Sequence, residues 1–354
     1  MSKAEVGKTS TARAPWSVSG RCYVIAEAGV NHNGELPLAM KLVDAAVAAN
    51  ADAVKFQTFR AERFISPVAD RAEYQIASTG GHESQLEMVK KLELPLEAFR
   101  KLKIYSEECG ITFLSTPFEQ ESADFLDEIG VPAFKLSSGE VTNLDFLRHV
   151  ARKQKPIILS TGMADLEEVR EAVNAIRESS AVEFVLLHCV TNYPSQPASA
   201  NLRAMETMHK EFGCAVGFSD HTLGVELALA ACALGARVIE KHLTLDCKMP
   251  GPDHSASLEM HEFASMVEGI RQIESALGDG VKRPAAEELP VIKVARRSLA
   301  AAQDLSAGTV LTVAHIAAMR PGTGIAPKLR QSLIGRKVRQ PIRAGTLLAF
   351  EMFE

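Results

Sequence analysis

Four side chains in this 354-residue sequence have types and positions that suit chemistry on an anionic molecule. Lys55, Lys135, His221 and His242 each lie at or near the end of a short apolar run. Two ammonium groups beside Ser and Thr hydroxyls suit a small ligand that carries both a phosphate and a carboxylate. Two neutral imidazoles suit a divalent metal ion and leave positions open for substrate and water. We therefore predict an anion site and a metal site, with solvated lysines and hydrogen-bonding histidines as the alternative interpretation.

Three glutamates, Glu27, Glu140 and Glu240, also end or follow apolar runs. A carboxylate in such a position is a candidate general acid or base, because a buried polar site can shift its pKa. For Glu240, an ion pair with Lys241 or with one of the two predicted site lysines is the alternative.

The elements that must position these residues are eight short apolar runs, each bounded by turn residues and followed by a helical pattern. The runs are Cys22–Ala28, Ala53–Gln57, Thr112–Ser115, Ala133–Leu136, Ile157–Leu159, Phe184–His188, Ala215–Phe218 and Val238–Lys241. Such runs are typical of strands buried on both faces, and eight strand–helix units predict a TIM (β/α)8 barrel, an α/β fold. Functional groups of such barrels lie at the C-terminal strand ends. A doubly wound sheet is the alternative, but the turn after the first run lacks the GxGxxG signature.

The chain divides into four parts by composition and pattern. We expect a flexible tail over residues 1–20, a barrel over 21–280, a linker over 281–294 and a small, mostly β domain over 295–354. The last part contains two similar segments, which begin at Leu305 and Ile342. Within the barrel, the long polar stretch Thr58–Leu94 interrupts the strand–helix rhythm, and we expect it to lie over the barrel mouth.

Composition limits which binding partners and which cellular compartment we expect for this protein. The net charge of −5 gives no electrostatic reason to expect nucleic acid or an anionic membrane. Six cysteines occur without a CxxC pair, which is typical of reduced core cysteines and favours a cytoplasmic location. No apolar stretch is long enough to span a bilayer.

Several strings of residues resemble the sialic acid synthase family, from about Tyr23 to the C-terminus. The strings include Val54-Lys55-Phe56-Gln57, Ser115-Thr116-Pro117-Phe118, Lys135-Leu136-Ser137-Ser138-Gly139-Glu140, Asn192-Tyr193-Pro194, Ser219-Asp220-His221-Thr222, Glu240-Lys241-His242 and Arg320-Pro321-Gly322-Thr323. The resemblance implies a barrel followed by a small antifreeze-like domain (the SAF, β-clip fold). It also implies a domain-swapped homodimer, in which the small domain of one subunit covers the barrel of the other.

The resemblance also implies a reaction. Enzymes of this family condense phosphoenolpyruvate with an N-acetylated amino sugar to a nine-carbon 2-keto-3-deoxy sugar acid and release phosphate. The sugar would be N-acetylmannosamine or 2,4-diacetamido-2,4,6-trideoxymannose, which gives a neuraminate or a legionaminate. Alternatives are a pseudaminate synthase, another phosphoenolpyruvate-dependent 3-deoxy sugar acid synthase, or a carbohydrate- or ice-binding protein without activity.

Site residues follow from the matching motifs. The phosphoenolpyruvate ligands implied by the resemblance are Lys55, Thr116, Lys135, Ser138, Ser160, Asn192 and Ser219. The implied sugar ligands are Glu27, Gln57, Phe118, Tyr193, Asp253 and, from the partner subunit, Arg320 of this sequence. His221 and His242 would bind a divalent metal ion, Mn²⁺ first, with Mg²⁺ or Co²⁺ as alternatives. Met319 stands where the family usually has a basic residue. For activation of the water we expect Glu140 first and Glu240 second, with Glu27 as a third catalytic carboxylate.

Overall fold

The chain forms two compact units, the first ending at Gly278 and the second running over Asp279–Glu354. The computed structural model describes residues 14–18, 20–73, 75–76, 80 and 83–354. Each unit has its own hydrophobic core, so the two are described separately.

Eight parallel strands build the first unit. They are β1 (Tyr23–Gly29), β2 (Ala53–Thr58), β3 (Thr112–Pro117), β4 (Phe134–Leu136), β5 (Ile157–Ser160), β6 (Phe184–Cys189), β7 (Ala215–Asp220) and β8 (Val238–Thr244). They are paired in the order β3-β2-β1-β8-β7-β6-β5-β4, and the two edge strands β3 and β4 contact each other. The sheet therefore curls into the expected TIM-type barrel, and each end of the expected strands lies within three residues of the observed end.

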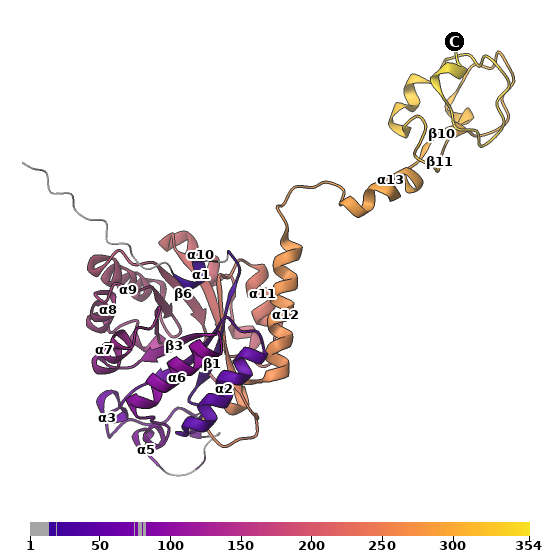
Figure 1. Cartoon of the computed structure of the whole chain (residues 1–354). Coiled ribbons are helices and arrows are strands. Elements are labelled where there is room, and N and C mark those ends of the chain that lie inside the picture. Colours follow the sequence, from indigo (N-terminus) through magenta and orange to yellow (C-terminus); the bar gives the residue numbers. More distant parts are fainter. Residues whose placement is uncertain (1–13, 19, 74, 77–79, 81–82) are drawn as a thin grey trace, which may run out of the picture. The chain divides into compact units, whose positions relative to one another are not determined.

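Helices follow the strands and lie around the outside of the barrel (Figure 1). They are α2 (Leu36–Ala48), α6 (Leu96–Glu108), α7 (Gln120–Glu128), α8 (Leu144–Ala151), α9 (Leu166–Ser179), α10 (Ala204–Phe212), α11 (Glu226–Ala233) and α12 (Met260–Leu277). Local signals fix their ends: the side chain of Asp165 accepts hydrogen bonds from the backbone N–H groups of Glu167 and Glu168, which caps α9.

The chain before β1 differs from the expected flexible tail. Residues 1–13 and 19 of that tail lie outside the described residues, but Pro15–Val18 form a short helix, α1. Trp16 is only 1% exposed and packs with the inward-facing apolar side chains of the strands, among them Ile25 and Leu114. The Ser17 hydroxyl donates a hydrogen bond to the Glu183 carboxylate. Because an indole ring removes a large apolar area from water, this segment belongs to the barrel unit.

The second unit is built from short segments whose backbones pair with one another. Strands β10 (Ser298–Ala301) and β11 (Ile316–Met319) form an antiparallel pair. The two similar segments found in the sequence pair with each other, because Leu305 and Ile342 exchange both backbone hydrogen bonds at 2.8 Å. Each segment turns at an equivalent glycine with positive φ, +85° at Gly308 and +79° at Gly345, where a side chain would be strained.

The expected linker over 281–294 contains helical structure. A 3₁₀ turn at Ala286–Glu288 is followed by α13 (Leu289–Ala295). The core of the second unit follows this helix along the chain, in a cluster that includes Leu299, Leu333 and Phe353.

Candidate active site

Six of the predicted site residues each come two positions after an apolar residue of the same strand, and the side chains of those apolar residues fill the interior of the barrel. Ile25, Ala53, Leu114, Ala133, Ile158 and Val238 belong to the inward-facing cluster around Trp16. Side chains alternate between the two faces of a strand, so the residue two positions later points inward as well. Those later residues are Glu27, Lys55, Thr116, Lys135, Ser160 and Glu240. The convergence of the site is therefore a direct result of strand periodicity.

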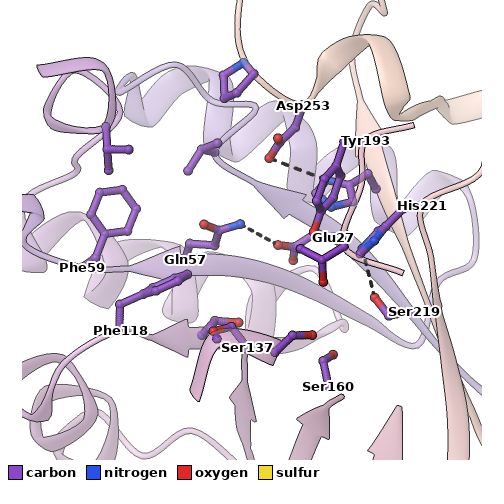
Figure 2. A pocket seen from close by; sticks show the side chains of 18 of the residues that line it. Glu27, Gln57, Phe59, Phe118, Ser137, Ser160, Tyr193, Ser219, His221 and Asp253 are labelled. Carbon is purple, nitrogen blue, oxygen red and sulfur yellow. Dashed lines mark hydrogen bonds and ion pairs between the residues drawn. The ribbon is translucent and has the colours of Figure 1, made fainter. Parts of the chain in front are cut away.

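These residues line one cavity of about 400 Å³ at the C-terminal ends of the strands (Figure 2). Of the predicted residues, the cavity brings together Glu27, Lys55, Gln57, Thr116, Phe118, Lys135, Ser138, Ser160, Tyr193, Ser219, His221, Glu240, His242 and Asp253. The geometry agrees with the expected mouth site of a barrel.

A network of buried charges forms the floor of the cavity. The ammonium of Lys55 lies 2.5 Å from the carboxylate of Glu27 and 3.8 Å from that of Glu240. It also donates a hydrogen bond to the Thr116 hydroxyl at 3.1 Å. Lys135 lies 3.5 Å from the other oxygen of Glu240. Glu240 is thus held between two cations, which leaves both ammonium groups directed at the same small volume.

Burial and neighbouring charges set the protonation of this network. Burial favours the neutral amine of Lys55, but Glu240 and Glu27 outweigh that effect and raise its pKa. Burial lowers the pKa of Lys135. The pKa of Glu240 is lowered, because the charges of Lys135 and Lys55 outweigh the effect of burial. The pKa of Glu27 is raised, because burial outweighs the charge of Lys55. The pKa values of the two lysines are therefore shifted in opposite directions, and so are those of the two glutamates.

The two histidines lie together at one side of the cavity, with ring centroids 5.7 Å apart. Nδ1 of His221 is 2.7 Å from the Val190 carbonyl, which can only accept, so Nδ1 carries the proton and Nε2 keeps its lone pair. Burial lowers the pKa of His221 to about 4, and burial together with His221 lowers the pKa of His242 well below its usual value. Both imidazoles are therefore neutral at pH 7, as metal ligands must be.

The donor set fits a divalent metal ion with two protein ligands. Nδ1 of His242 is buried and has no hydrogen-bond partner among the described residues, and the same holds for one carboxylate oxygen of Glu240. In the described part of the chain, no group of three or more His, Cys, Asp or Glu side chains is placed to hold a metal. Substrate and water would have to complete the coordination of an ion at His221 and His242.

The predicted sugar ligands lie above the charged floor. The amide of Gln57 donates to Glu27 at 3.1 Å, and the ring of Tyr193 lies 4.1 Å from that of His221, centroid to centroid. Asp253 lies 3.9 Å from His242 Nδ1, and burial, with help from Glu27, raises its pKa to about 7.

Two predicted residues of the first unit, Glu140 and Asn192, do not line the cavity. Glu140 lies in the 3₁₀ turn Ser138–Glu140, where its carboxylate accepts a hydrogen bond from Asn143, and it does not line the cavity. Asn192 is exposed, and its neighbour Thr191 lines the cavity instead. Arg320 belongs to the second unit, where its guanidinium donates to the Ala295 carbonyl. The lining of the cavity gives the expected role of Glu140 in water activation no support, because in a turn that follows a strand the strand alternation no longer fixes the direction of a side chain.

Sequence reasoning missed a group of apolar cavity residues. Val30, Phe59, Phe64, Val89 and Leu92 line the cavity together with Phe118. Four of them come from the stretch Thr58–Leu94, which was expected over the mouth but without named residues. The signal in the sequence was weak, because these side chains come from short helices and turns: α3 (Ala61–Phe64) and α5 (Gln85–Lys90).

A buried ion pair stands directly behind the two histidines. The ammonium of Lys241 lies 2.7 Å from Asp220 and donates to the Thr222 carbonyl at 2.7 Å, and both charged side chains are 0% exposed. Asp220 and Lys241 are neighbours in the β7–β8 register, and strand alternation turns them away from the cavity. The pair therefore joins the two strand ends that carry His221 and His242.

Fold and site together define a TIM-barrel protein with two lysines, several hydroxyl groups and two histidines gathered in one cavity at the strand ends. Residues 42–282 match the NeuB family, and residues 296–354 match the SAF domain. The chain belongs to the NeuB family.

Curated relatives and a solved structure agree with this assignment. The chain is 47% identical to the N,N'-diacetyllegionaminic acid synthase of Campylobacter jejuni, over 89% of this chain and 95% of the relative. It is 44% identical to the enzyme of the same name from Legionella pneumophila, over 96% and 97%. It is also similar to the N-acetylneuraminic acid (sialic acid) synthetase of Leptospira borgpetersenii, solved in complex with citrate. That likeness has a TM-score of 0.69 and 35% identity, and it covers 77% of this chain and 90% of the other.

Proposed function

We propose that this protein condenses phosphoenolpyruvate with an N-acetylated amino sugar to a nine-carbon 2-keto-3-deoxy sugar acid, with release of inorganic phosphate. The observation that carries the proposal is the convergence of two buried lysines, several hydroxyls and two neutral imidazoles in one cavity. The names of the C. jejuni and L. pneumophila relatives support this reaction class. The sugar is N-acetylmannosamine or 2,4-diacetamido-2,4,6-trideoxymannose.

Phosphoenolpyruvate binds at the charged floor. Lys55 and Lys135 neutralise its phosphate and carboxylate, and hydroxyl groups complete the hydrogen bonds of its oxygens. The hydroxyls are those of Thr116, Ser138, Ser160 and Ser219. The side chain of Ser160 is buried without a hydrogen-bond partner among the described residues, so it has a hydrogen to donate to such a ligand.

The reaction forms one carbon–carbon bond and breaks one carbon–oxygen bond. Carbon three of phosphoenolpyruvate attacks the aldehyde carbon of the open-chain sugar, and the aldehyde oxygen takes up a proton. Carbon two becomes electron-poor, water adds to it and loses a proton. Phosphate then leaves with the electron pair of its bond to carbon two, and the added hydroxyl loses its proton to become the ketone. Proximity of the two bound substrates supplies much of the acceleration.

In this mechanism Glu240 serves the electron-poor carbon, and its position between the two lysines supports that role. Its carboxylate lies between Lys55 and Lys135 and accepts a hydrogen bond from Ser219 at 3.1 Å. A carboxylate held there stabilises positive charge at carbon two and accepts the proton of the incoming water. Glu27 orients the sugar in this mechanism, and its contacts with Lys55 and Gln57 support that role.

His221 and His242 would hold a divalent ion, with Mn²⁺ as first choice and Mg²⁺ or Co²⁺ as alternatives. Bound there, the ion would supply Lewis acidity toward the aldehyde oxygen. The protein's own part is to fix the imidazoles: the Val190 carbonyl holds the His221 tautomer, and the Tyr193 ring lies against both histidines.

Assembly, domain limits and location complete the proposal. We retain a domain-swapped homodimer in which Arg320 of a second copy reaches the sugar, with a barrel over 21–280, a linker over 281–294 and an antifreeze-like domain over 295–354. All six cysteines are described and are free thiols, which supports a reducing, cytoplasmic environment. No helix among the described residues has the length and apolar character to cross a membrane.

The test is release of phosphate from phosphoenolpyruvate in the presence of Mn²⁺, with each of the two sugars offered separately. We expect release with at least one sugar, loss of release on adding a chelator, and recovery on restoring Mn²⁺. Glu140→Gln serves as a control, because its carboxylate does not line the cavity. Absence of release with both sugars would refute the proposed reaction.

A further inference from the structure

Each histidine of the cavity directly follows a charged residue that points away from the cavity. The pairing of β7 with β8 ends at Asp220 and Lys241. His221 is the first residue beyond β7, whereas His242 lies inside β8 and is paired with Glu27 of β1. The strand ladder therefore fixes the backbone at His242 but ends one residue short of His221.

A single ammonium group holds the chain on both sides of His221. The residue before it is Asp220, whose carboxylate lies 2.7 Å from the ammonium of Lys241. The residue after it is Thr222, whose carbonyl accepts a hydrogen bond from the same ammonium at 2.7 Å. The other carboxylate oxygen of Asp220 accepts hydrogen bonds from the backbone N–H and the hydroxyl of Thr222, at 2.9 and 2.7 Å. Asp220, Thr222 and Lys241 thus form a clamp that anchors the backbone of His221 to β8.

The rings of the two histidines are held in different ways. Nδ1 of His221 donates to the Val190 carbonyl at 2.7 Å, and the His221 carbonyl accepts from the backbone N–H of Ser195 at 2.8 Å. Nδ1 of His242 is buried and has no hydrogen-bond partner among the described residues. The separation of the two rings therefore depends on how the ends of β7 and β8 are held together, which is where the clamp lies.

The ion pair inside the clamp is a poor choice if stability alone is needed. Breaking a buried pair is costly, but a buried pair itself adds little, because taking both charges out of water offsets most of their attraction. Apolar side chains of similar volume often stabilise a protein as well or better. Asp220 and Lys241 are fully buried, so an apolar pair would suit this location. Apolar side chains have no directed hydrogen bonds, however, so they could not hold the chain on both sides of His221.

We propose that Lys241, together with Asp220, is a positioning residue for the metal site and sets the separation and direction of the two imidazoles. Two imidazoles hold one ion only when their lone pairs meet at a common point. Groups behind metal ligands that orient them change metal affinity by about 10–100-fold. This inference rests on the metal site of the proposed function, and it gives a role to two residues that do not line the cavity.

The experiment measures the Kd of Mn²⁺ for the full chain without substrates, from the electron paramagnetic resonance signal of free Mn²⁺ during a titration. Lys241→Met should raise the Kd by about tenfold to hundredfold. The double variant Asp220→Asn/Lys241→Met leaves no unpaired charge in the interior but still lacks the clamp. Its Kd should therefore stay raised by a similar factor, although less stability is lost than the two single changes would give together.

Trp16→Ala is the matched control for lost stability. Trp16 is buried at the other end of the barrel, among residues that begin strands, such as Ala53 and Val238. Its removal leaves a large cavity and destabilises the barrel, but it should change the Kd of Mn²⁺ less than about twofold.

Three results would overturn the inference: an unchanged Kd in Lys241→Met, a normal Kd in the double variant, or a Kd raised equally by Trp16→Ala. Absence of Mn²⁺ binding by the wild type would overturn both the inference and the assignment of His221 and His242 as metal ligands. Phosphate release by the wild type is measured separately, so failure of the proposed reaction is distinguished from failure of the clamp.

Discussion

Replacing Asp220 by Asn tests whether the buried ion pair behind the histidines holds the barrel together. The change leaves the ammonium of Lys241 without its counter-charge at a position that is 0% exposed. Breaking a buried pair in this way destabilises proteins by about 3–5 kcal/mol, because the remaining charge is neither solvated nor paired. We expect a loss of that size in the free energy of unfolding.

Lys241→Met instead leaves the negative charge of Asp220 without its ion-pair partner. Asp220 retains two hydrogen bonds, from the Thr222 backbone N–H at 2.9 Å and the Thr222 hydroxyl at 2.7 Å. We expect this variant to lose less than Asp220→Asn. The double variant removes both charges, so its loss should fall short of the sum of the single losses by about 2 kcal/mol or more.

The pH dependence of the free energy of unfolding gives an independent check of this reasoning, because the direction of the change with pH can be predicted. Burial lowers the pKa of Lys241 in the folded chain, and loss of Asp220 lowers it further. The folded Asp220→Asn variant then binds fewer protons than its unfolded state, so its stability rises with pH. The deficit relative to the wild type should therefore be smaller at pH 9 than at pH 7.

The assay is urea unfolding followed by the fluorescence of Trp16, the only tryptophan in the sequence, which is buried inside the barrel. An Asp220→Asn variant within about 1 kcal/mol of the wild type, or a double variant whose loss equals the sum of the single losses, would refute the reasoning.

Three further predictions concern the site and the base of the barrel. His221→Ala should abolish phosphate release and should also reduce the number of Mn²⁺ ions retained in equilibrium dialysis; full retention would contradict the metal assignment. Glu240→Gln should lower kcat by about a hundredfold or more, whereas Glu140→Gln should change it less than about threefold, as measured with saturating substrates. The reverse order would return the water-activating role to Glu140. Trp16→Ala should reduce stability by about 3–5 kcal/mol in urea unfolding followed by circular dichroism. Trp16→Phe should cost less, because the indole N–H is buried without a hydrogen-bond partner among the described residues. Equal losses for the two changes would contradict the packing role.

What the sequence determined by itself is the barrel and the floor of its site. Short apolar runs followed by helical patterns predicted the eight strands, because strands buried on both faces tolerate few polar residues. The same period-2 alternation that buries Ile25 and Leu114 directs Glu27 and Thr116 into the cavity. For residues inside strands, position in the chain was therefore enough to predict position in the site.

Tertiary structure decided what lies outside the strands. Glu140 follows β4 in a 3₁₀ turn, and only the fold shows that its carboxylate lies outside the cavity beside Asn143. Trp16 precedes the first strand in a segment whose composition suggests a tail, yet it packs into the barrel interior. The apolar residues of the cavity include Phe59 and Phe64, which follow β2, and Phe118, which follows β3. Such groupings depend on long-range packing of loops and short helices, for which no local periodicity exists, so they could be read only from the folded chain.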